Sequence, residues 1–359
     1  MGRLLTVTRD GTLVEEYRYD PEGTGTRTYE MNALRGITGR NLSYSDEDHL
    51  LTAGTTTYEY DADGFMLTKT SGTEITQYEY STRGELLSVS LPDGRTIEYL
   101  YDPLSRRTAK LVNGTVVEKY LWQGLTRLLA VYDGSDSLLM RFEYADGRMP
   151  VAMSKNASTY YLTFDQVGSF KAVADSAGNV VKSIEYDSFG NIINDSNPNF
   201  EIPFAFAGGL HDRDTGLIRF GFRDYDPDIG RWTAKDPILF AGGDTDLYGY
   251  CLNDPVNLVD SLGLSFESSD IISAGIAAMT TSMKVGGLIA AGTAQAIGAV
   301  TTVLAVFALP SDLYASEDFD LYLYEVEQER ILLEKRIEDL ERKYEPMFKK
   351  FHVEASPCS

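Results

Sequence analysis

Residues 58–64 read YEYDADG, and variants of this stretch recur along the first half of the chain. They include YEYSTRG (78–84), YLYDPLS (99–105), FEYADG (142–147) and IEYDSFG (184–190). Counted on the second aromatic residue, the copies fall 20 to 22 residues apart, at Tyr60, Tyr80, Tyr101, Trp122, Tyr144, Phe164 and Tyr186. A steady period of this length is typical of a repeat architecture, in which each unit packs against its neighbours.

Each unit is predicted to form a β-hairpin. The two aromatic residues of a copy stand at i and i+2, as Tyr58 and Tyr60 do, so both side chains lie on one face of a strand. Dipeptides that favour a type I′ turn occur at 93–94, 113–114 and 133–134. We expect the hairpins to stack into one sheet in which the 23 tyrosines pack their rings and keep their hydroxyls in water. Carbohydrate binding by exposed rings is the alternative.

The composition disfavours several classes of function. The 359 residues carry a formal net charge of −22, which argues against a nucleic-acid partner bound through its phosphates. Two cysteines are too few for a disulfide framework, and three scattered histidines are too few for a histidine-rich metal site. We therefore expect no metal and no cofactor. No apolar signal-peptide core is visible near the first residue, so the chain itself shows no export signal.

The repeat, with its Y-x-Y-D-x-x-G pattern, resembles the YD repeats of the RHS family, which includes bacterial polymorphic toxins, the C component of insecticidal Tc toxins and the teneurins. The resemblance extends over residues 1–264. It implies a mainly β fold, in which residues 1–200 form a spiralling antiparallel sheet of hairpins, the β-shell, and residues 201–264 form the RHS-associated core, which plugs it. It also implies a secreted or cell-surface protein whose partner is the remainder of the shell or a companion shell protein.

Residues 208–264 resemble the RHS-associated core almost throughout, and they include the stretches RFGFRDYDPDIGRWTAKDP at 219–237 and NLVDSLGL at 257–264. In many family members this core cuts the chain just after its terminal D-P-x-G-L motif, and two aspartates and an arginine are implicated. The matching positions in this chain are Asp236, Asp260 and Arg223. The resemblance thus implies an aspartyl-type peptidase that acts on its own chain.

These residue types suit that chemistry. Two neighbouring carboxylates cannot both ionise easily, so one keeps its proton and serves as general acid while the other activates water. Arg223 would orient one carboxylate or polarise the carbonyl of the cleaved bond, Leu264–Ser265, and Gly263 would let the backbone approach the acids closely. The alternative is a purely structural set of Asp-Pro turns and neutralising arginines. Ser261 stands where the family motif usually has proline, which removes a backbone constraint beside one acid.

The character of the chain changes after residue 264. Residues 265–310 are predicted to form Ala/Gly-rich hydrophobic helices, because the 25 residues at 285–309 carry no charge and could span a bilayer. A soluble helix pair buried in protein is the alternative. Residues 311–359 are predicted to form an amphipathic helix and tail, because the apolar residues of 317–351 alternate at coiled-coil spacing. This helix would mediate self-association or pack on its own domain.

Two hypotheses follow for the function. In the first, the chain is the C-terminal part of an RHS-repeat protein, whose core cleaves after Leu264 and releases a helical, membrane-active effector. In the second, it is a non-catalytic structural or adhesion module at the cell surface, anchored and oligomerised by its helical tail. The tail shows no phosphate loop, metal motif or paired nucleophile and base, so a nuclease or deaminase cargo is not indicated.

Overall fold

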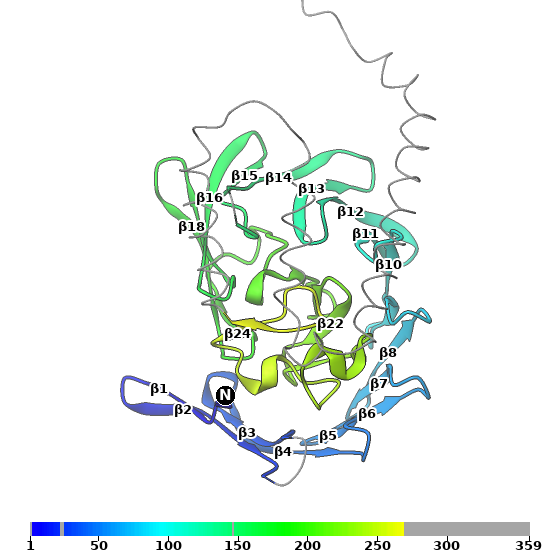
Figure 1. The fold of residues 1–359 in the computed structure, drawn as a ribbon. Coiled ribbons are helices and arrows are strands. Elements are labelled where there is room, and N and C mark those ends of the chain that lie inside the picture. Colours follow the sequence, from blue (N-terminus) through cyan, green and yellow to red (C-terminus); the bar gives the residue numbers. More distant parts are fainter. Residues whose placement is uncertain (1, 22–24, 146, 269–359) are drawn as a thin grey trace, which may run out of the picture. The chain divides into compact units, whose positions relative to one another are not determined.

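The computed structural model describes residues 2–21, 25–145 and 147–268 (Figure 1). Over these residues the chain is mainly antiparallel β-sheet, as the repeat and the family resemblance predicted. The predicted membrane segment at 285–309 and the predicted self-association segment at 317–351 lie outside the described residues. The predicted helical region at 265–310 is described only as far as Ser268.

One sheet contains 19 strands, and each strand pairs antiparallel with the next one along the chain. The strands are β1 (Thr6–Arg9), β2 (Thr12–Tyr19), β3 (Arg27–Asn32), β4 (Ile37–Tyr44), β5 (Leu50–Ala53), β6 (Thr56–Tyr60), β7 (Met66–Ser71), β8 (Glu74–Tyr80), β9 (Leu86–Ser90), β10 (Thr96–Tyr101), β11 (Arg107–Val112), β12 (Thr115–Gln123), β13 (Arg127–Asp133), β14 (Leu138–Glu143), β15 (Ala152–Lys155), β16 (Ser158–Phe164), β17 (Phe170–Asp175), β18 (Val180–Tyr186) and β19 (Ile192–Asp195). The sheet curls around the later part of the chain, drawn in green to yellow (Figure 1).

The aromatic pairs face the inside of this curl. Tyr58 and Tyr99, each the first aromatic residue of its unit, are both only 3% exposed. The second aromatic residues, such as Tyr60 and Tyr101, pack against the same apolar cluster. The predicted shared face is therefore confirmed, and the rings serve packing between strands rather than an exposed sugar-binding surface.

The tyrosine hydroxyls do not stay in water as expected. In five units the second aromatic residue donates a hydrogen bond to a backbone carbonyl 15 to 17 residues earlier. These donor and acceptor pairs, 2.6 to 2.8 Å apart, are Tyr19 and Leu4, Tyr44 and Arg27, Tyr101 and Leu86, Trp122 and Arg107, and Tyr144 and Leu128. The bond ties each hairpin to the one before it, which explains why a residue with a polar tip recurs at this position.

The aspartate of the YD motif shapes the turn that follows. Asp61 Oδ1 accepts the backbone N–H groups of Asp63 at 3.0 Å and Phe65 at 2.8 Å. Gly64 then adopts a left-handed φ of +83°, which glycine tolerates without strain. The same acceptor pattern recurs at Asp102, Asp133, Asp165 and Asp187.

The expected type I′ turns occur at only one of the three predicted places. Asn113 and Gly114 both have positive φ, of 50° and 74°, as this turn requires. At 93–94 only the glycine has positive φ, and at 133–134 neither residue does. In those two turns the aspartate side chain caps the following amides, so the backbone does not need two left-handed residues.

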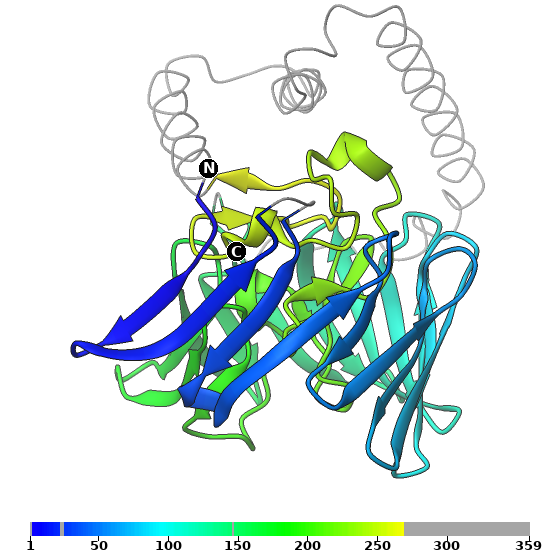
Figure 2. The ribbon, with the colours of Figure 1, turned by 90° about the horizontal axis from the view of Figure 1, so that it is seen from below.

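We call residues 202–268 the plug, because they lie inside the curl of the sheet (Figures 1 and 2). A four-stranded sheet and a two-stranded one form its frame. Their strands are β20 (Leu210–His211), β21 (Ile218–Phe220), β22 (Arg223–Asp226), β23 (Arg231–Trp232), β24 (Leu258–Val259) and β25 (Glu267–Ser268). Short 3-10 turns are η1 (Ala33–Arg35) in the shell, and η2 (Phe206–Gly208), η3 (Leu239–Gly242) and η4 (Cys251–Asn253) in the plug.

Two apolar clusters fill the space between shell and plug. One joins strands of the first half of the sheet to Leu217 and Ile229 of the plug. The other joins strands of the second half to most of the plug's aromatic residues, including Phe206 and Trp232. Trp232 is 1% exposed and packs within this second cluster.

Candidate active site

Three separate elements of the plug supply the predicted site residues. Arg223 begins β22, Asp236 follows β23, and Asp260 comes directly after β24. The loop that ends at Leu264 is held beside β22, because the N–H of Phe222 donates to the carbonyl of Leu262 at 2.8 Å. Residues 37 positions apart in the sequence therefore meet in the interior of the plug.

The two carboxylates share one arginine. Arg223 Nη2 lies 2.8 Å from Asp236 Oδ2 and 3.1 Å from Asp260 Oδ2. Its Nε donates to the carbonyl of Gly263 at 2.6 Å, and its guanidinium stacks 4.3 Å over the ring of Trp232. Arg223 thus bridges both acids and contacts the carbonyl one residue before the predicted cleavage site, instead of binding one carboxylate with both nitrogens.

The junction after Leu264 lies against these acids. The N–H of Leu264 donates to Asp260 Oδ1 at 3.0 Å. One small hollow is bordered by the two carboxylates, by Arg223 and by Leu264 and Ser265. The structure therefore brings together all five residues that the sequence singled out for cleavage.

Burial sets the protonation of this cluster. Asp236 and Asp260 are 5% and 3% exposed. Burial raises the pKa of Asp236 to about 6, although Arg223 acts in the opposite direction. Burial also raises the pKa of Asp260, while Arg223 and the backbone N–H groups of residues 263–265 oppose the rise. A single arginine faces both carboxylates, so the cluster favours holding one proton.

The structure also places Gly263 and Ser261, the two other residues that the sequence singled out near the acids. Gly263 has a φ of +69°, and a β-carbon there would lie 2.6 Å from the carbonyl oxygen of Phe220. Glycine is therefore needed for the close approach to the β21–β22 backbone, not to the acids. Ser261 borders a separate hollow together with Arg148 and Trp122.

Sequence reasoning missed two contributors to the cluster. The backbone carbonyl of Leu247 accepts from Arg223 Nη1 at 3.2 Å and from the N–H of Asp236 at 3.0 Å. Every residue has a carbonyl, so no signal in the sequence could have found it. Gly242 borders the same hollow as the acids. The Gly-Gly pair at 242–243 was the one available sign of a crowded backbone.

The other acids of the RFGFRDYDPDIGRW stretch serve the contact with the shell. Asp224 pairs with Arg107 of β11 at 2.8 Å. Asp226 and Asp228 lie 3.0 and 3.2 Å from Lys69 of β7. These ion pairs give the three aspartates a structural role.

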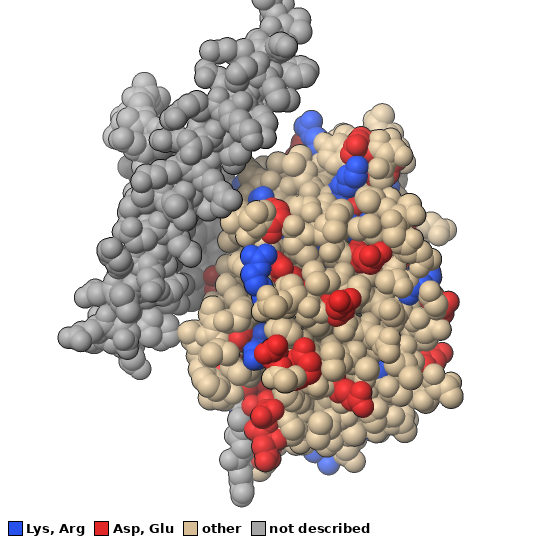
Figure 3. All heavy atoms as spheres, turned by 90° about the vertical axis from the view of Figure 1, so that its right-hand side faces the viewer, with Lys and Arg blue, Asp and Glu red and all other residues tan. Residues whose placement is uncertain are grey.

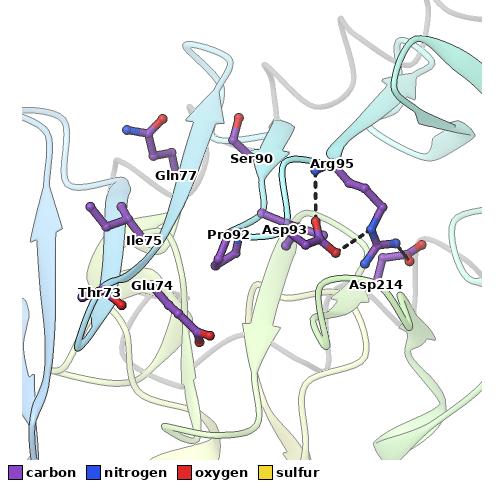
Figure 4. A pocket seen from close by; sticks show the side chains of 10 residues that line it. Thr73, Glu74, Ile75, Gln77, Ser90, Pro92, Asp93, Arg95 and Asp214 are labelled. Atoms are coloured by element: carbon purple, nitrogen blue, oxygen red, sulfur yellow. Dashed lines mark hydrogen bonds and ion pairs between the residues drawn. The ribbon is translucent and has the colours of Figure 1, made fainter.

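A larger hollow than the one at the acids lies elsewhere among the described residues. It has a volume of about 780 Å³ and is bordered by the β7–β8 and β9–β10 turns and by Asp214 of the plug (Figure 4). Arg95, which borders this hollow, forms ion pairs with Asp93 and Asp214. None of the residues that line the hollow belongs to the acid cluster. One outer face of the molecule shows basic and acidic side chains dispersed among uncharged ones (Figure 3). Neither this hollow nor that face holds a pair of buried carboxylates beside the predicted cleavage site.

Comparison with known proteins identifies the fold family. A family model described as Teneurin YD-shell matches residues 1–256. The chain belongs to the teneurin YD-shell family. Teneurin-3 of Danio rerio is 32% identical over 273 residues, which cover 72% of this chain and 10% of that protein. Teneurin-m of Drosophila melanogaster is 33% identical over 226 residues, which cover 60% of this chain and 8% of Teneurin-m.

This member of the YD-shell family spans about a tenth of the length of the curated relatives it matches. The solved structure titled TcdB2-TccC3-TEV is 20% identical and has a TM-score of 0.42, over 71% of this chain and 14% of that one. Within the described residues, no helix combines the length and the apolar character that crossing a bilayer requires. The same part of the chain contains no group of three or more His, Cys, Asp or Glu residues placed to hold a metal ion.

Proposed function

We propose that this YD-shell protein cleaves its own chain between Leu264 and Ser265 and thereby releases its C-terminal segment. The observation that carries the proposal is the pair of buried carboxylates, Asp236 and Asp260, bridged by Arg223 Nη2 beside this junction. The β-shell would then be the scaffold that holds the plug in its cleaving conformation.

The positions of the two acids suggest different roles. Asp260 lies on the amide side of the junction, where the N–H groups of residues 263–265 act on its carboxylate. Asp236 lies near the carbonyl side, because its Oδ2 and the Leu264 carbonyl oxygen both border Gly242. We assign the ionised carboxylate to Asp260 and the proton to Asp236. Hydrogen bonds from amides favour the charged form, and three amides act on Asp260 while one, that of Ile238, acts on Asp236.

The reaction needs one water molecule. Asp260 takes a proton from the water as its oxygen adds to the carbonyl carbon of Leu264, and Asp236 gives its proton to the carbonyl oxygen. The C–N bond then breaks, Asp260 passes its proton to the nitrogen of Ser265, and Asp236 regains one from the new carboxyl group. Arg223 holds the two acids in place and limits their mutual repulsion.

Intact mass measurement of the purified full chain tests the cleavage. We expect a fragment that begins at Ser265 in the wild type, and a whole chain in Asp236→Asn and Asp260→Asn. Asp254→Asn is the matched control, because Asp254 lies in the plug and hydrogen-bonds to Asn257 rather than to the cluster. A wild-type chain that stays whole would defeat the peptidase proposal and leave the structural module as the function.

The pH dependence of the cleavage rate provides a second test. Asp236 must keep its proton to act as the acid, so the rate should fall as the pH rises through about 6. Ionised Asp260 is needed as well, so the rate should also fall in strong acid. Arrest of the reaction in urea and quantification of the fragment would give the profile. A rate that keeps rising from pH 6 to pH 8 would contradict the assignment of the proton to Asp236.

We also propose that further shell strands are the partner, supplied by the remainder of the shell or by a companion chain. In the described part of the chain, β1 pairs only with β2 and β19 only with β18, so each has one open edge. A second copy of the chain is a usable probe. Sedimentation should show association that Thr8→Pro in β1 reduces, because proline removes a backbone donor. A monomer at every concentration would argue against pairing through this edge.

A secreted or cell-surface location follows from the same proposal. Fractionation of the producing cells tests it, and a chain found only inside the cell would contradict it. A membrane-active cargo remains a prediction from residues 285–309, outside the described residues.

A further inference from the structure

A short turn of the plug folds back over one of the two acids. Asp236 Oδ1 accepts the N–H of Ile238 at 2.9 Å, which leaves Oδ2 for the contact with Arg223. The chain then forms η3 and reaches Gly242, which is buried. Asp236 thus caps the start of the turn, and Gly242, at the end of the turn, lies beside the same carboxylate.

Gly242 borders the gap between this acid and the junction, and its lack of a side chain leaves the gap open. A β-carbon at this position would lie 2.5 Å from the carbonyl oxygen of Leu264 and 2.7 Å from Asp236 Oδ2. Both distances are shorter than a carbon atom tolerates. The φ of Gly242 lies outside the left-handed region, so the backbone conformation would accept other residues. The space beside Gly242 is therefore what requires glycine here.

We propose that Gly242 is a positioning residue for the cleavage, because its missing side chain keeps open the space between the Asp236 carboxylate and the Leu264 carbonyl oxygen. This inference rests on the proposed self-cleavage. When water adds, the carbonyl carbon becomes tetrahedral and its oxygen must move while it receives the proton of Asp236. A methyl group in this space would separate the acid from that oxygen.

Gly242→Ala in the full chain tests the inference. We expect the cleavage rate to fall about 100-fold, the loss that a displacement of about 1 Å causes in a reacting pair. Gly147→Ala is the matched control, because a β-carbon there meets no atom closer than 3.9 Å and its φ is also ordinary. A rate for Gly242→Ala within threefold of the wild type would overturn the proposal.

Gly243→Ala separates lost space from a strained turn. Gly243 has a φ of +89°, so alanine strains the backbone, but its β-carbon would lie 3.4 Å from the Phe266 ring, outside the gap. We expect Gly243→Ala to lower the melting temperature and still cleave within a few-fold of the wild-type rate. Equal loss of cleavage in both variants would overturn the proposal, because any damage to the turn would then suffice.

The pH profile adds a readout that general damage to the fold would not shift. A methyl group beside Asp236 excludes water from the carboxylate, so the pH above which the residual rate falls should move upward in Gly242→Ala. An unchanged pH profile would contradict the proposal. A Gly242→Ala chain that no longer melts cooperatively would also contradict it, because the space beside Gly242 would then be needed for folding. A wild-type chain that is not cut would instead refute the proposed function itself.

Discussion

The two halves of the curled sheet hold the plug by different forces. Strands of the first half reach it through ion pairs: the half-buried pair of Lys69 with Asp226, and the buried pairs of Arg107 with Asp224 and of Lys110 with Asp212 at 2.9 Å. Strands β12 to β19 form no ion pair with the plug among the described residues. They contact it through apolar side chains and backbone groups.

Both halves pack rings against the plug, as Tyr60 of β6 does with Tyr248 at 5.7 Å, but only the first half adds ion pairs among the described residues. Phe142 of β14 packs against Phe204 of the plug with ring centroids 4.9 Å apart, and Tyr186 of β18 lies 6.5 Å from Phe206. Apolar burial stabilises without directional demands. A buried ion pair gains little net free energy, since desolvation offsets attraction, but its loss leaves an uncompensated charge. We therefore expect the second half to supply stability and the first half to fix the position of the plug.

The largest effect should come from the apolar half. Phe206→Ala removes a ring that is 4% exposed and lies near Tyr186, Tyr225 and Tyr250. We expect the free energy of unfolding to fall by about 3–5 kcal/mol in urea denaturation. Phe240→Ala, whose side chain is 67% exposed in the same plug, should cost within about 0.5 kcal/mol. Similar losses in the two variants would remove the distinction.

Breaking the most buried ion pair should cost nearly as much. Asp224 lies between Arg107 and Arg219, and all three side chains are at most 3% exposed. Asp224→Asn leaves two buried guanidinium groups without a carboxylate, so we expect a loss of about 3 kcal/mol. Asp136→Asn is the control, because Asp136 is 78% exposed and its pair with Lys119 should contribute little. A loss below about 1 kcal/mol for Asp224→Asn would mean that water reaches the cluster.

A moderate, pH-dependent effect is expected at Asp212. Burial would raise its pKa, but Lys110 and hydrogen bonds outweigh burial and lower the pKa of Asp212 below 3.8. A depressed pKa contributes stability above the unfolded-state value, and this stability is lost as the pH falls through the folded-state value. Asp212→Asn should therefore cost about 2 kcal/mol at pH 7 and progressively less as the pH falls below 3.8.

Urea midpoints across that pH range would measure the Asp212 effect, with exposed Asp63→Asn as the control. A cost that stays constant with pH would show that the carboxylate acts through its shape instead of its charge.

The smallest effect is expected at the rim of the polar half. Arg95 and Asp214 form an ion pair in which the side chains are 40% and 27% exposed. A double-mutant cycle with Arg95→Gln and Asp214→Asn should give a small favourable coupling at low ionic strength, and the coupling should fall in 1 M NaCl. Coupling that resists salt would place this pair with the buried ones.

The repeating unit could be predicted from local sequence patterns. The i and i+2 aromatic residues and the aspartate that caps each turn act within one hairpin, so Tyr58, Tyr60 and Asp61 reveal their structure locally. Motif matching also pointed to Arg223, Asp236 and Asp260. It could not show that Asp226 and Asp228 face a shell lysine while a similar Asp236 faces the peptide junction.

The partners of these aspartates depend on how shell and plug pack together. The curl of the sheet sets which strand faces which part of the plug, and close packing brings Gly242 between Asp236 and Leu264. Such contacts join residues far apart in the sequence, and the side-chain period of a strand carries no information about them. The tyrosine hydroxyls likewise bond to backbone carbonyls that every residue possesses, so their acceptors appear only when neighbouring hairpins stack.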